Sequence, residues 1–207
     1  DNCGRPVDLE YTEVLDPGEC QNRFNILRTW TAVDDCGNAT FRVQLVVVDD
    51  QTAPTWDQTA PQPTVSVACA ADVPAMPWQT ASDNCGVSVN VDAVETVIPG
   101  DCPNQYQIVR IWTVIDDCGN ATSRQQTVTV SDTQAPQWEQ ENLPQNLSLE
   151  CGEAVPAATA LTVTDNCDTP VDVDFNETYQ PGAGPNDENI IVRTWTATDA
   201  CGNAIVH

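Results

Sequence analysis

Residues 110–120 read Arg-Ile-Trp-Thr-Val-Ile-Asp-Asp-Cys-Gly-Asn, and this stretch decides the fold class because the chain contains it three times. Closely related stretches begin at Arg28 and at Arg193. In each copy, a run rich in β-branched and aromatic residues, typical of a strand, leads into a Cys-Gly-Asn turn. The sequence is therefore built from repeats that share this strand and this turn.

Other landmarks recur in the same order with a period of about 82 residues. Asp-Asn-Cys, Pro-Gly and Cys-Gly-Asn occur once per repeat, and Asp-x-x-Ala-Pro-x-Trp occurs between repeats. Asp-Asn-Cys begins at Asp1, Asp83 and Asp165, and Pro-Gly begins at Pro17, Pro99 and Pro181. Cys-Gly-Asn begins at Cys36, Cys118 and Cys201, and the junction motif begins at Asp50 and Asp132. The junction motif predicts a partial first repeat (1–50) lacking its N-terminal strands, a complete second repeat (51–132), and a third repeat (133–207) truncated before its last strand.

The complete repeat predicts an all-β fold. Segments rich in Val, Ile and Thr alternate with turn motifs, and no apolar pattern of helical spacing is present. The expected strands are Thr64–Cys69, Val87–Ile98, Gln105–Ile115 and Ala121–Val130. About 80 residues of short strands favour tandem immunoglobulin-like antiparallel β-sandwich repeats, disulfide-pinned, with Trp30, Trp112 and Trp195 in their cores.

Charge and composition exclude several classes of function. The net charge is -24, with 31 acidic residues and no lysine, so nucleic acid and anionic membrane surfaces are poor partners and no membrane insertion is expected. The single histidine is His207, and no nucleophile motif or phosphate loop is present. Paired carboxylates occur once per repeat rather than once per chain, so the sequence indicates a protein that is not an enzyme.

The ten cysteines predict disulfides and hence an oxidising compartment, because none has the spacing of a zinc site. Four cysteines per repeat allow three pairings. If loops at the same end of a sandwich meet, the pairs are Cys85–Cys118 and Cys69–Cys102, with Cys3–Cys36 and Cys167–Cys201 in the flanking repeats. Cys20 and Cys151 are then without a partner in this chain. Cys151 is expected to be a buried thiol, since Gly184 replaces its partner; a cross-link to another chain is the alternative.

Acidic side chains gather in the turns that flank each junction. Calcium is bound by six to eight oxygen ligands, and closely spaced carboxylates repel one another unless a cation neutralises them. The hypothesis is a calcium ion at each junction; the alternative is that Asp and Asn only form and solvate the turns. The candidate ligands are Asp49, Asp50, Asp83, Asn84, Asp116, Asp117, Asn120, Asp132, Asp165, Asn166, Asp168, Asp199 and Asn203.

With these motifs, the chain resembles HYR-like repeats of the four-cysteine kind. The resemblance implies a long secreted or cell-surface protein of Bacteroidota, of the kind that includes adhesins linked to gliding motility and exported by the type IX secretion system. The expected location is extracellular, at the cell surface, either anchored in the outer membrane or secreted.

The expected function is that of a non-catalytic stalk or adhesin segment that supplies reach, rigidity and cell adhesion. Its partners would be neighbouring repeats of the same long chain, and surface polysaccharide or other cell-surface components. The alternative is a polysaccharide-binding accessory module, because the third repeat diverges most, between Asp168 and Asn189.

Overall fold

The structure is a computed structural model that describes residues 4, 6–86, 89–182, 184 and 188–207. It is 48% strand and 2% helix, which confirms the all-β, disulfide-pinned fold class. Its elements, in chain order, are β1 (Asp8–Pro17), β2 (Arg23–Val33), β3 (Ala39–Asp49), β4 (Thr55–Trp56), β5 (Thr64–Val67), η1 (Ala70–Asp72), β6 (Ala81–Ser82), β7 (Val91–Cys102), β8 (Gln105–Ile115), β9 (Ala121–Ser131), β10 (Gln137–Trp138), β11 (Val163–Thr164), β12 (Val173–Gln180), β13 (Ile190–Thr198) and β14 (Ala204–Val206).

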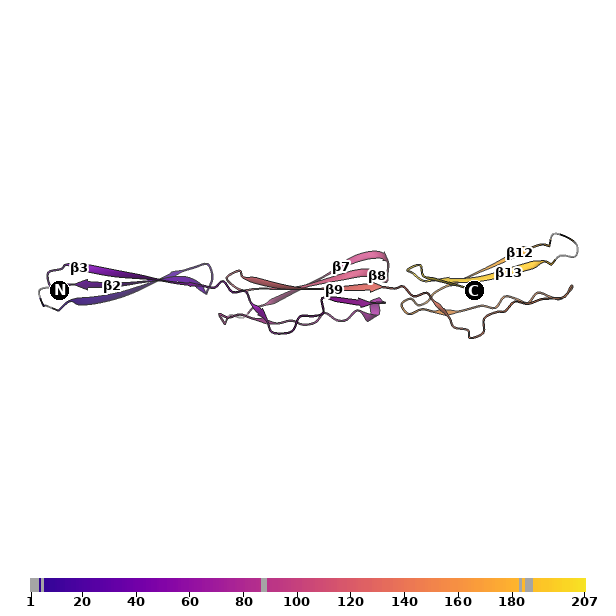
Figure 1. Cartoon of the computed structure of the whole chain (residues 1–207), viewed down its shortest axis with the longest axis horizontal. Coiled ribbons are helices and arrows are strands. Elements are labelled where there is room, and N and C mark those ends of the chain that lie inside the picture. The colour runs from indigo at the N-terminus through magenta and orange to yellow at the C-terminus, as the bar shows by residue number, and fades with distance from the viewer. Residues whose placement is uncertain (1–3, 5, 87–88, 183, 185–187) are drawn as a thin grey trace. The chain divides into compact units, whose positions relative to one another are not determined.

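The strands form one larger sheet per repeat (Figure 1). The orders are β1-β2-β3, β5-β9-β8-β7 and β12-β13-β14, and two small sheets pair β4 with β6 and β10 with β11. The hairpin partners are antiparallel, but β5 joins β9 in parallel, a pairing that the sequence did not indicate. Among the described residues, no helix has the length and apolar character needed to cross a membrane.

The chain divides into two compact units, and each of them contains one repeat junction. The first unit consists of Asp1–Pro61, Pro77–Val94 and Ile111–Gln125, and the second of Gln62–Met76, Glu95–Arg110 and Gln126–His207.

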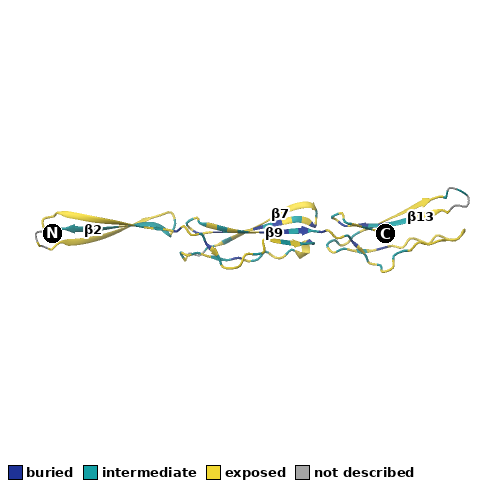
Figure 2. Ribbon diagram, in the orientation of Figure 1, coloured by how far each residue is buried: buried dark blue, intermediate teal, exposed yellow. Residues whose placement is uncertain are grey.

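Burial differs between the expected core tryptophans. Trp112 and Trp195 are 1% and 5% exposed, and the indole N–H of Trp195 donates to the Thr159 carbonyl at 3.0 Å. Trp30 is only half-buried and contacts Tyr11, because the described residues place no second layer on the sheet β1-β2-β3. Most of this sheet is coloured as exposed in Figure 2. The core prediction therefore holds for two of the three tryptophans.

The Pro-Gly pairs of the first two repeats lie before the hairpin turn and do not form it. Strand β7 continues through Pro99 and Gly100 to Cys102. A Cβ atom added to Gly100 would lie 1.9 Å from the carbonyl oxygen of Gln105 on β8. Glycine is required there because the two backbones approach too closely for any side chain. The same holds for Gly18 beside Arg23.

Candidate functional site

Each described disulfide joins one repeat to the next. The pairs are Cys20–Cys118, Cys69–Cys167 and Cys102–Cys201, each with a Cα–Cα distance of 5.1 Å. That separation is within the range for a disulfide. In every pair, a cysteine after the first strand or in the Pro-Gly hairpin of one repeat meets a cysteine in a turn of the following repeat.

The predicted pairing within repeats is therefore wrong. Cys85–Cys118, Cys69–Cys102 and Cys167–Cys201 do not form, and Cys20, expected to lack a partner, is bonded. The prediction considered only partners at the same end of one sandwich. At a junction, the turns of the next repeat reach the same cysteines and form the bonds.

The remaining cysteines are not engaged in described disulfides. The predicted pair Cys3–Cys36 includes Cys3, which lies outside the described residues; Cys36 is an exposed free thiol. Cys85 is free and half-buried. Cys151 is also free, but it is exposed, so the expectation of a buried thiol is wrong.

The Cys-Gly-Asn turn has the same construction in all three repeats. In the second repeat, Oδ1 of Asp116 accepts hydrogen bonds from the N–H groups of Cys118 and Asn120, and Oδ2 accepts from the Asn120 amide. The glycine between them has a φ of +87°, which favours glycine. Burial raises the pKa of Asp116, but these hydrogen bonds outweigh it, and the pKa is lowered overall. This carboxylate is therefore held charged by its own turn.

Four carboxylates converge at the second junction. Asp132 follows β9, where its N–H donates to the Asn104 carbonyl at 3.0 Å. Asp165, Asp168 and Asp199 come from two turns of the third repeat. One oxygen from each of the four lies within 4.8 Å of the others. Asp132 and Asp199 are 6% and 7% exposed.

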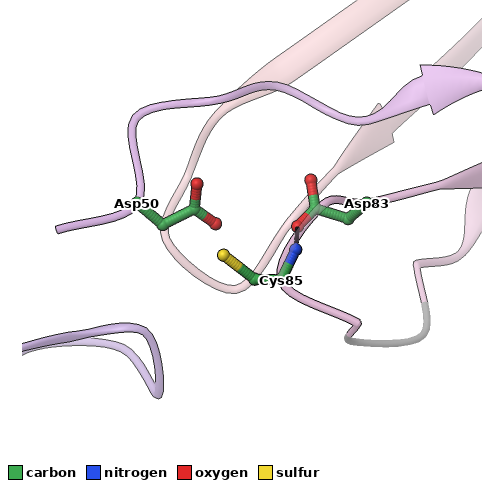
Figure 3. A group of neighbouring side chains, drawn as sticks. All are labelled: Asp50, Asp83 and Cys85. Atoms are coloured by element: carbon green, nitrogen blue, oxygen red, sulfur yellow. Dashed lines mark hydrogen bonds between the residues drawn. The ribbon is translucent and has the colours of Figure 1, made fainter. Parts of the chain in front are cut away.

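The first junction brings together a smaller group, namely Asp50, Asp83 and Cys85 (Figure 3). Asp50 is 5% exposed, and Oδ1 of Asp83 accepts a hydrogen bond from the Cys85 N–H at 2.9 Å. The contact with the Asp50 carboxylate, followed by burial, raises the pKa of the Cys85 thiol. This thiol is therefore neutral at physiological pH and a poor ligand for a hard cation.

Each junction leaves two buried carboxylate oxygens without a hydrogen-bond partner among the described residues. They are the Oδ2 atoms of Asp50 and Asp83 at the first junction, and of Asp132 and Asp165 at the second. Such atoms are rare, because a buried polar atom without a partner costs free energy.

The other predicted ligands have different roles. Asp49 pairs with Arg23, Asp117 accepts from the Gln21 N–H, and the Asn84 amide lies 3.3 Å from the Cys85 sulfur. The side-chain amides of Asn120 and Asn203 donate within their own turns and toward the carbonyls of Asp50 and Asp132. Asn166 contacts Asp132 and the Cys69–Cys167 disulfide.

Sequence reasoning missed Asn104, which is 6% exposed. Its side chain accepts from the Ala70 N–H and donates to Asp168 at 3.0 Å, so it connects the second repeat to a turn of the third. The sequence contains a pattern that could have indicated this residue, because an asparagine stands two residues after the hairpin cysteine in both of the first two repeats, at Asn22 and Asn104.

The comparisons with known proteins agree with this description. No curated protein matches the chain. Domains of the HYR-like kind are non-enzymatic, adhesion-type modules, and together with the disulfides they indicate an extracellular location. Residues 57–130, which include four of the cysteines described above, match the model of the HYR-like domain with 4 cysteines, and this match supports an HYR-like domain in that part of the chain.

Proposed function

We propose that this chain is a load-bearing spacer segment of a long extracellular adhesin. The observation that carries the proposal is that the described disulfides join consecutive repeats, so tension between repeats passes through covalent bonds. The family resemblance extends the proposal to cell-surface or secreted adhesins of gliding Bacteroidota exported by type IX secretion.

The disulfides shorten the covalent path through the chain. From residue 1, the path follows residues 1–20, crosses to Cys118, returns to Cys102, crosses to Cys201 and ends at residue 207. It contains about 44 residues, which span about 150 Å when fully extended, against about 700 Å for all 207 residues. A spacer of this kind limits its own extension even if its sheets unfold.

The free thiols fit the same pairing pattern. Cys85 occupies the position of Cys167, which is bonded to the first-strand cysteine of the preceding repeat. Cys36 occupies the position of Cys118, and Cys151 that of Cys69. We propose that neighbouring repeats of the same long chain are their partners. Each bond would form as two thiols lose two protons and two electrons to a disulfide oxidant outside the cytoplasm.

Stretching single molecules by their two ends tests the proposal. In non-reducing buffer, we expect the extension to stop near about 150 Å, and after reduction near about 700 Å. Pairing within repeats would leave a path of about 110 residues, or about 370 Å. That intermediate limit, or a limit that reduction does not change, would refute the load-bearing role.

Polysaccharide binding is a second candidate, and Trp78 is the observation in its favour. Its side chain is 84% exposed, and an exposed indole offers a flat apolar surface. Substitution Trp78→Ala should then abolish retention on a polysaccharide column, whereas substitution of exposed Leu147 by Ala should not. Equal retention of the unsubstituted protein and the two variants, or no retention of any of them, would exclude this role for Trp78.

A further inference from the structure

We propose that Asp132, Asp165, Asp168 and Asp199 form a calcium site at the second junction. Nothing in this inference depends on the load-bearing role. It starts from the convergence of the four side chains, each of which has an oxygen within 4.8 Å of the others. Convergence of acidic groups is common on protein surfaces, but these particular groups are distinguished by how they are buried and hydrogen-bonded.

Two of the converging carboxylates have a buried oxygen without a partner among the described residues. Asp132 is only 6% exposed, and its Oδ2 atom accepts no hydrogen bond from the described residues; the same is true of Oδ2 of Asp165. Buried carboxylate oxygens normally have a hydrogen-bond or metal partner. A cation in contact with both of them would supply that partner.

Hydrogen-bond donors hold other oxygens of these carboxylates in place. Oδ1 of Asp165 accepts from the N–H groups of Cys167 and Asp168, both at 2.9 Å. Asp168 accepts from the Asn104 amide at 3.0 Å and from the Ala200 N–H at 2.8 Å. Asp199 is fixed by its own turn. The carboxylates are therefore positioned before any ion arrives, which reduces the entropy lost on binding.

The chemistry of the ligands favours calcium over other metal ions. The donors are carboxylate oxygens, and the neighbouring sulfur atoms of Cys167 and Cys201 are in disulfides. Hard oxygen donors without thiolate or imidazole select calcium or magnesium over zinc and copper. Carboxylates from separate turns give irregular geometry, which calcium tolerates and magnesium does not.

The first junction provides an internal comparison. Gly86 stands where the third repeat has Asp168, and the first junction brings together two carboxylates where the second brings together four. The Nδ2 atom of Asn22, equivalent to that of Asn104, has no hydrogen-bond partner among the residues that the structure describes. The neutral thiol of Cys85 adds no hard ligand. Calcium should therefore bind more weakly at the first junction than at the second.

Binding would couple the ion to the contact between repeats. Asp132 is the last residue of the second repeat, whereas the other three aspartates belong to the third. The Asn166 amide lies 3.4 Å from Asp132 and 2.7 Å from the Cys167 sulfur, so the disulfide and the proposed site share a neighbour.

The test is isothermal titration calorimetry of the oxidised chain, after removal of metal with a chelator, with calcium chloride and then magnesium chloride. We expect saturable calcium binding that magnesium does not reproduce. Substitutions Asp132→Asn and Asp168→Asn should each raise the calcium Kd at least about 10- to 100-fold. The matched control is Asp174→Asn, the same change of charge at an exposed position on β12, and it should leave the Kd unchanged.

Absence of calcium binding at millimolar concentration would overturn the proposal. So would equal effects of the Asp174→Asn and Asp132→Asn substitutions, because those would indicate general screening of the negative charge. If Asp132→Asn prevents folding, Asp168→Gly tests the same site, since it gives the second junction the residue found at the first. The extension limit expected from the stretching experiment in chelator is the same whether or not the chain binds calcium. The two proposals can therefore fail independently.

Discussion

Arg110 is the most deeply buried charged side chain of the second unit, and its environment recurs in the third repeat. Its side chain is 3% exposed; it pairs with Glu95 at 2.7 Å and donates to the Pro74 carbonyl and to the Gln126 side chain. Arg193 likewise donates to the Pro156 carbonyl. In both repeats, the arginine holds an irregular segment against the central strand of the sheet.

Substitution Arg110→Ala should lower the free energy of unfolding by about 2 to 4 kcal/mol, because it leaves the buried side chain of Gln126 and the Pro74 carbonyl without their donor. Glu95 is 41% exposed, so its own charge contributes little. The matched substitution is Arg28→Ala, at the equivalent residue, which is 35% exposed and should have a much smaller effect. Urea denaturation followed by tryptophan fluorescence measures both. Equal losses of unfolding free energy in the two variants would contradict the stabilising role of the buried Arg110.

The pKa of Asp34 is lowered, first by the hydrogen bond from the Asn38 amide and then by the Asn38 backbone N–H. A carboxyl group with a lowered pKa stabilises the fold above its usual pKa, and this contribution is lost as the pH falls through the lowered value. Substitution Asn38→Ala should therefore raise the pKa of Asp34 toward the usual aspartate value. NMR titration of the carboxyl carbon measures this shift, and Asn25→Ala is the control that should leave it unchanged.

At the scale of elements, the hairpins of the first two repeats each carry one cysteine near the turn, Cys20 and Cys102, and the next repeat carries its partner in a turn. The position of each cysteine relative to its strand follows from the sequence. The partner does not, because strands of similar length place several cysteines at each end of a repeat.

Tryptic digestion without reduction should distinguish the two pairings, because the chain contains seven arginines and no lysine. We expect peptide 1–23 to be linked to 111–124, and peptide 43–110 to be linked to both 125–193 and 194–207. Pairing within repeats would instead link 43–110 to 111–124, and 125–193 to 194–207. Mass spectrometry before and after reduction identifies the linked peptides, and the second pattern would contradict the structure.

At the scale of the whole molecule, the net charge of -24 opposes close association of the chain with itself, and covalent bonds between repeats resist that repulsion. Each repeat is small and has a modest core, so disulfides contribute a large part of its stability. The same disulfides hold consecutive repeats together and, in the proposed function, transmit force between them.

The sequence by itself determined the repeat, its period, the β-class, the main strands of the second repeat and the clustering of carboxylates near each junction. These features are local, because alternation of apolar residues and turn chemistry depend on neighbours along the chain. Only the tertiary structure decided that Cys69 bonds to Cys167 rather than to Cys102, and that Asp132 meets Asp168 through Asn104. Those contacts join residues far apart in sequence on two different repeats, and the period of a repeat does not show which faces of consecutive copies meet.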